Sequence, residues 1–204
     1  MDSEHTYKTI QAPSEAIYKE KGSKFLAFAV PCTTEEQIKE QLEVWRKSHS
    51  QANHVCYAYK LGFKGEQYRA NDDGEPSNSA GQPILGQLSS FEVTNVLIGV
   101  VRYFGGTKLG VGGLIHAYRT SAKEALENAT IETRSIQQIL ELHFTYKDMP
   151  AVMNIVKQSG ANVMRQDFEL DCTLTVAVSP SDKETFSEKF ELLQNVTITD
   201  KGLA

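Results

Sequence analysis

Cysteine is scarce in this chain of 204 residues, which contains only three. Cys32, Cys56 and Cys172 are odd in number and far apart, so a disulfide framework is not expected. No two cysteines have the close spacing of a zinc site, and His54 with Cys56 would need further ligands that are not evident. We therefore expect no metal site and no cofactor, and we interpret His54 and Cys56 as partly buried strand residues.

Long apolar runs are also absent. No stretch approaches the roughly 20 apolar residues that a helix needs to span a bilayer. The first residues, MDSEHTYKTI, lack the apolar core of a signal peptide. Low-complexity tracts are missing too, and the composition (40% hydrophobic, 23% charged) is that of an ordinary globular protein. We expect a cytoplasmic protein that does not interact with a membrane.

Acidic residues are missing from one stretch of an otherwise acidic chain. The formal net charge is -5, yet no acidic residue occurs between Glu92 and Glu124. Within this stretch, residues 96–101 form a near-continuous apolar run, which predicts a strand covered on both faces. The order of the following residues predicts a glycine-rich turn and then a helix from Leu114. The glycines are Gly105, Gly106, Gly110, Gly112 and Gly113.

We interpret this stretch as an anion site for phosphate or a nucleic-acid backbone. Glycines let backbone N–H groups approach a ligand, and a helix N-terminus favours negative charge. The spacing matches neither the Walker A motif nor the dinucleotide motif. The alternative is a structural turn with solvated lysines. The predicted contacts are Lys108, Arg119 and Lys123, supported by Arg102 and His116, with His116, Arg119 and Lys123 on one helix face.

The most polar segment, residues 71–82, predicts a long surface loop. Its acidic side chains are Asp72, Asp73 and Glu75. They could bind Mg²⁺ or act as acid and base, and the alternative is that they only solvate the loop.

The first part of the chain alternates strand and helix patterns. Residues 5–31 predict β-structure with a basic hairpin tip, in which Lys19, Lys21 and Lys24 surround Gly22. On its own, that tip is interpreted as a solvated turn. A helix follows, capped by Thr33 or Thr34 and ending near Ser48, with an apolar stripe of Ile38, Leu42 and Trp45.

The pattern restarts after a polar linker at residues 132–138. The later segments follow the order β-α-β-β-α-β, which is that of a ferredoxin-like domain. We therefore predict an α+β protein of two domains, residues 1–134 and residues 137–204. No cluster in the second domain resembles a catalytic site.

Two long motifs resemble a known family. NDDGEPSNSAGQPIL and VVRYFGGTKLGVGGLIHAY look like the signature of the IMPACT (imprinted and ancient) family, in particular its bacterial YigZ-type members. KGSKFLAFAV and NHVCYAY fit earlier blocks of that family. The resemblance covers the whole chain, with small departures such as Ser79 in place of the usual threonine.

The resemblance implies a fold and a set of partners. The N-terminal domain would be similar to domain IV of elongation factor G, with a left-handed β-α-β crossover, and the C-terminal domain to domain V. Eukaryotic relatives regulate translation under amino-acid starvation by competing for the activator of a translation-factor kinase. We therefore expect a translation-associated protein, not an enzyme, that binds RNA or the ribosome through the basic, glycine-rich patch. The alternatives are an enzyme acting on a phosphorylated small molecule and a protein-interaction module in translational stress control.

Overall fold

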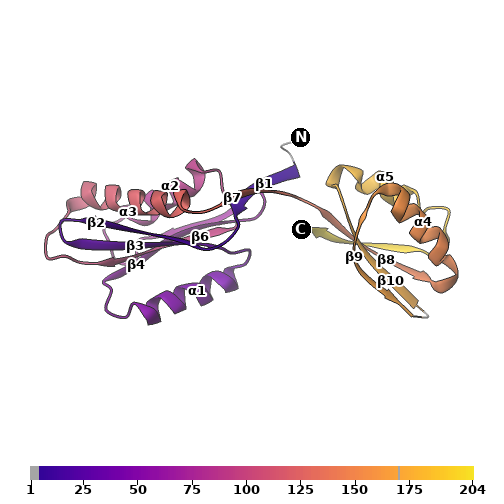
Figure 1. The fold of residues 1–204 in the computed structure, drawn as a ribbon, viewed down its shortest axis with the longest axis horizontal. Helices are drawn as coiled ribbons and strands as arrows, with labels where there is room; N and C mark the ends of the chain where they lie inside the picture. The colour runs from indigo at the N-terminus through magenta and orange to yellow at the C-terminus, as the bar shows by residue number, and fades with distance from the viewer. Residues whose placement is uncertain (1–4, 170) are drawn as a thin grey trace. The chain divides into compact units, whose positions relative to one another are not determined.

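The computed structural model describes residues 5–169 and 171–204, and the chain forms two compact units. One unit is Tyr7–Arg134, and the other is Ser135–Ala204 together with residues 5 and 6. Each contains an antiparallel sheet and helices (Figure 1), so the predicted α+β class with two domains is confirmed. None of the helices in the described part of the chain combines the length and apolarity needed to cross a membrane.

The N-terminal unit is built on a five-stranded sheet in which all neighbouring strands are antiparallel. Across the sheet the order is β2 (Ser14–Glu20), β3 (Ser23–Pro31), β6 (Val96–Tyr103), β4 (His54–Leu61) and β5 (Gln67–Asn71). The central strand, β6, has the sequence VLIGVVRY and is buried as far as Arg102. The apolar run predicted this double coverage correctly, although the strand extends beyond residue 101.

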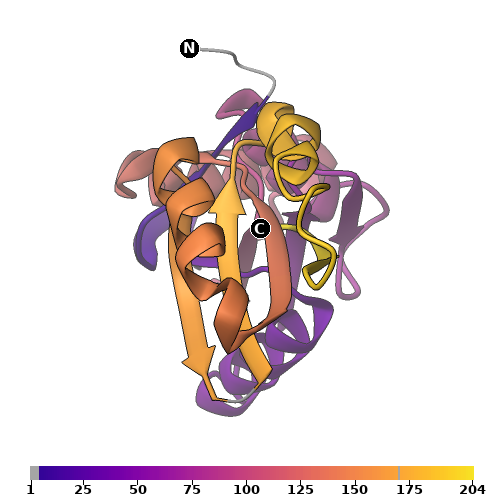
Figure 2. The ribbon, with the colours of Figure 1, turned by 90° about the vertical axis from the view of Figure 1, so that its right-hand side faces the viewer.

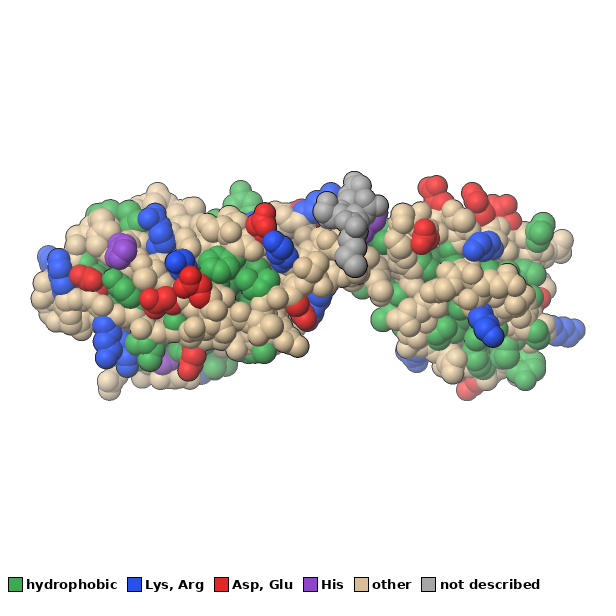
Figure 3. All heavy atoms as spheres, turned by 45° about the horizontal axis from the view of Figure 1, so that its top comes forward, with side chains coloured by type: hydrophobic (Ala, Val, Ile, Leu, Met, Phe, Trp, Pro, Cys, Tyr) green, Lys and Arg blue, Asp and Glu red, His purple; other side chains and the backbone are tan. Residues whose placement is uncertain are grey.

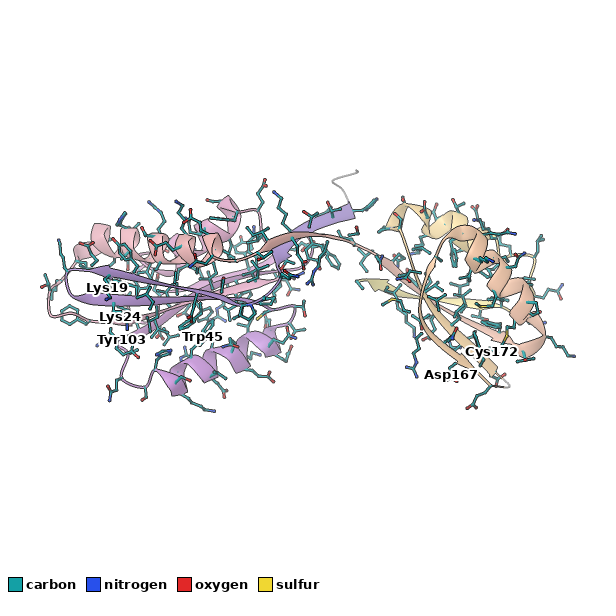
Figure 4. All side chains as sticks on the ribbon, in the orientation of Figure 1. Lys19, Lys24, Trp45, Tyr103, Asp167 and Cys172 are labelled. Atoms are coloured by element: carbon teal, nitrogen blue, oxygen red, sulfur yellow. The ribbon has the colours of Figure 1, made fainter. Side chains whose placement is uncertain are left out.

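Helices cover both faces of this sheet. α2 (Gly81–Ser90) and α3 (Gly110–Glu127) pack on one face, and α1 (Glu35–Ser48) packs on the other (Figure 1). Trp45 lies between α1 and the sheet (Figure 4). Thr34 caps α1 as predicted, because its hydroxyl accepts the Gln37 N–H at 3.3 Å. A separate pair of strands, β1 (Thr6–Ile10) and β7 (Ile131–Ser135), forms its own small sheet.

The C-terminal unit has the element order predicted from the sequence. The elements are β8 (Gln138–Thr145), α4 (Met149–Ser159), β9 (Asn162–Phe168), β10 (Asp171–Val178), α5 (Lys183–Glu188) and β11 (Thr197–Leu203). The strand order β11-β8-β10-β9 is antiparallel throughout. Both helices pack on one face of the sheet (Figure 2), where Val152 and Phe186 contact the core made by Leu140, Leu142 and Phe144.

Candidate nucleic-acid interface

The turn between β6 and α3 is shorter than the sequence predicted. β6 ends at Tyr103 and α3 begins at Gly110, so three of the five glycines fall within the bounds of the helix. The prediction that the helix starts at Leu114 is therefore wrong by one turn. Glycine disfavours helix, but α3 buries Leu114, Ala117 and Tyr118 against the sheet, and this packing outweighs local propensity.

The structure places different constraints on the five glycines. A Cβ on Gly105 would lie 1.9 Å from the carbonyl carbon of Gly22, so Gly105 lets the turn touch the tip of the β2–β3 hairpin. Gly106 and Gly110 have φ of 87° and 73°, which L-residues rarely adopt. A Cβ on Gly113 would be 3.0 Å from that of Leu109. Gly112 has neither reason, because a Cβ there would meet open space.

The predicted cations of α3 lie on its exposed side. Arg119 is exposed, and so is Lys108 just before the helix; neither has a carboxylate within 4.0 Å among the described residues. Lys123 is also exposed but forms an ion pair of 3.1 Å with Glu127. His116 is exposed and meets the Tyr18 ring edge-on at 6.1 Å. The spacing therefore placed these side chains correctly on one helix face.

The structure adds the lysines of the β2–β3 tip to this region. Lys19 and Lys24 are cross-strand partners, and Lys21 lies in the turn between them. The Ser23 hydroxyl accepts the Gly105 N–H at 3.1 Å, which holds the tip against the glycine turn. Lys19, Lys24 and Tyr103 lie together at one end of the sheet (Figure 4). The sequence interpretation treated this tip as an independent solvated turn and missed that it extends the basic surface.

The basic surface is local. On the face in Figure 3, basic side chains of the N-terminal unit alternate with acidic ones and do not form one broad field. Such a distribution suits contact with few phosphates, and therefore binding of limited strength with a shallow salt dependence.

The prediction that Arg102 supports anion binding at the surface needs correction, because Arg102 is buried. It is 5% exposed, and its guanidinium donates to Glu75 Oε1 at 2.6 Å. The guanidinium also lies over the rings of Phe25 and Phe104, at 5.5 and 5.6 Å from their centroids. A buried charge needs a counter-ion, and Glu75 supplies it. Arg102 is therefore already neutralised.

Two of the carboxylates that the sequence offered as a metal or acid–base site are bound by backbone N–H groups. Asp72 accepts the backbone N–H groups of Asn78, Ala80 and Gly81 at 2.8–3.0 Å, which secures the start of α2. Asp73 accepts the Val55 N–H at 2.7 Å. In residues 5–169 and 171–204, no three His, Cys, Asp or Glu side chains are placed to hold a metal ion. Asp72 and Asp73 therefore hold the loop against the start of α2 and against β4.

Glu75 is the centre of a buried polar network that the sequence did not reveal. Its Oε1 accepts from Tyr118 at 2.7 Å as well as from Arg102, and His54 Nε2 lies 3.9 Å away. The Cys56 thiol lies 3.3 Å from the Tyr118 hydroxyl. Burial raises the pKa of Cys56 and that of Tyr118 far above their ordinary values, so both groups stay protonated.

The thiols should be unreactive in the native protein. Burial raises the pKa of Cys32 to about 11, which leaves about 0.1% thiolate at pH 8. We expect Ellman's reagent at pH 8 to label no cysteine rapidly in the native state and all three in urea. Rapid labelling of one native thiol would contradict this burial and would point to a nucleophilic cysteine.

A cleft of about 440 Å³ opens above the network. Its floor includes Glu75 and Arg102, and its walls include Phe104, Val111 and Leu114. Lys108 lies at the same cleft, beside the first residues of α3. Polar groups at the floor and apolar side chains at the walls are typical of small-ligand sites.

Comparison with known proteins identifies the family. Residues 21–126 match the Impact N-terminal domain. The IMPACT family member YvyE of Bacillus subtilis is 31% identical over 94% of this chain and 88% of its own length, and YigZ of Escherichia coli is 30% identical over 87% and 88%. A crystal structure described as that of a hypothetical protein has a TM-score of 0.73 at 27% identity, covering 95% of this chain and 96% of its own. The domain match and the relatives that align over nearly the full length agree, and this chain belongs to the IMPACT family.

Proposed function

We propose that this protein is a cytoplasmic, translation-associated regulator that binds RNA or the ribosome through the N-terminal unit. The observation that carries the proposal is the row of exposed cations that runs from Lys108, just before α3, to Arg119 and Lys123 along the helix, whose first turn has no acidic residue. Exposed cations, and helix N–H groups without a side-chain cap, favour phosphate. Family membership supports the link to translation, because the eukaryotic members that this family resemblance brings in are regulators of translation.

This row of cations should act through charge. We expect the combined change Lys108→Gln, Arg119→Gln and Lys123→Gln to weaken RNA binding similarly for RNAs of different sequence. The slope of log affinity against log salt should fall by about 0.7 for each phosphate that the variant no longer neutralises. Filter binding or co-sedimentation with ribosomes at low and high salt measures both quantities.

A control with the same change in charge is available in the C-terminal unit. Lys157→Gln, Arg165→Gln and Lys189→Gln also replace two lysines and one arginine, all of them exposed. We expect this control to retain most of the affinity and salt slope. Equal losses in the two triple variants would show that net charge alone matters and would remove the α3 surface from the proposal.

Gly112 allows folding and binding to be separated. It lies in α3 with a helical backbone and open space around it, so Gly112→Ala should stabilise the protein by up to about 1 kcal/mol. If a phosphate approaches this bare backbone, the added methyl group should weaken RNA binding nonetheless. Thermal unfolding and RNA titration of the same sample test both effects. Unchanged RNA affinity would mean that no ligand approaches the helix at Gly112.

A further inference from the structure

We propose that the cleft above Glu75 and Arg102 binds one nucleotide unit, with its base between the apolar walls and its phosphate at the start of α3. This inference rests on the proposed function, since it names the part of an RNA that the surface would hold. The same chemistry could come from a free nucleotide, and the experiment below distinguishes the two sources.

The phosphate end of the cleft is formed by backbone N–H groups and one cation, Lys108. Leu109 precedes α3 and offers no side-chain cap, so the first N–H groups of the helix lack that partner. Gly110 and Val111 line the cleft, as does Lys108. At the floor, the Arg102 side chain is 7% exposed, and its Nε has no hydrogen-bond partner among the described residues. A buried donor without a partner is costly, so the floor of the cleft holds an unmet polar group.

The walls fit a flat, apolar-faced group. Phe104 is 46% exposed and Val111 is 53% exposed, although both are large apolar residues. Leu114 lies deeper and is buried. Exposed aromatic rings bind unstacked bases of single-stranded RNA, and stacking tolerates any base. A cleft of about 440 Å³ lies within the range of small-ligand pockets.

The floor fits the edge of a base better than a phosphate. The Glu75 carboxylate and the Arg102 guanidinium offer an acceptor next to a donor, and every nucleobase carries donors and acceptors along its edge. A phosphate at the floor would face the negative charge of Glu75, whereas at the α3 end it would face Lys108. The charges therefore fix which way a nucleotide enters.

A variant that fills the cleft without changing charge tests this inference. Val111→Trp places a large side chain at the rim, and Val44→Trp is the matched control because Val44 is 52% exposed on α1, outside the cleft. The probes are a single-stranded RNA decamer containing 2-aminopurine and free AMP and GMP. We expect Val111→Trp to weaken decamer binding about tenfold with an unchanged salt slope, because one base stack is lost but no charge. Val44→Trp should behave as wild type.

A second variant removes the stacking surface. Phe104→Ala should also weaken binding about tenfold and reduce the change in 2-aminopurine fluorescence. If wild type binds the decamer and both cleft variants bind it equally well with the same fluorescence change, the inference is wrong and the proposed function stands. If wild type binds no RNA but binds AMP or GMP in a way that Val111→Trp abolishes, the cleft is a free-nucleotide site and the proposed function is wrong. Binding of neither probe would overturn both.

Discussion

Glu75→Leu should lower the free energy of unfolding by about 3–5 kcal/mol, because it leaves the buried Arg102 charge without its counter-ion. The Glu75 side chain is 4% exposed, and that of Arg102 is 7% exposed. Little of either side chain meets solvent, so water replaces the missing carboxylate only poorly. Tyr118 also loses the acceptor of its hydroxyl. Urea denaturation followed by circular dichroism measures the change.

A second substitution distinguishes charge from packing in this network. In the double variant Glu75→Leu and Arg102→Met both charges are absent, and we expect most of the lost stability to return. The control is Glu92→Leu, which breaks the exposed pair between Glu92 and Lys8 and should have a much smaller effect. A double variant no more stable than Glu75→Leu would show that the cost comes from packing.

Trp45→Ala should lower the free energy of unfolding by a similar amount, about 3–5 kcal/mol. Trp45 is 5% exposed and stacks on Phe28 at 5.6 Å between ring centroids. It also fills the space that a side chain at position 99 would occupy. A Cβ on Gly99 would lie 2.1 Å from Cζ3 of Trp45, so Gly99→Ala alone should also destabilise the protein.

The losses in the free energy of unfolding caused by Trp45→Ala and Gly99→Ala should not be additive. In the Trp45→Ala background the space above Gly99 is open, so Gly99→Ala should cost nothing or stabilise the strand by about 0.5–1 kcal/mol. The four proteins of this cycle are compared by urea denaturation under identical conditions. Additive losses would mean that the cost of Gly99→Ala does not come from a clash with Trp45.

Local periodicity predicted most of the fold because each element has a clear pattern. The apolar run of β6 and the stripe of Ile38, Leu42 and Trp45 on α1 are examples. The start of α3 was missed because Gly110, Gly112 and Gly113 disfavour helix locally, and only burial of the next turn outweighs them. The family membership was predicted correctly from the two long motifs.

The sequence predicted correctly only those residues of the candidate site that lie on a single helix, α3. The exposed positions of His116, Arg119 and Lys123 follow from the helical period. Arg102 was misplaced because its partner Glu75 comes from a loop in another part of the chain, and no local pattern records such a pairing. One signal for this pairing was available in the sequence. Arg102 lies near the end of a strand that is buried on both faces, and a buried charge requires a partner.

The position of β6 in the middle of its sheet also has a consequence for how the chain folds during synthesis. β3 and β4 precede β6 in the sequence, and each pairs with it and not with the other. Until β6 has been made, the β2–β3 and β4–β5 hairpins can form only as separate pieces with unsatisfied inner edges. Closing the sheet joins residues as distant as Ala27 and Val100, a high contact order that slows folding. The nascent chain is therefore most prone to aggregate just before β6 emerges.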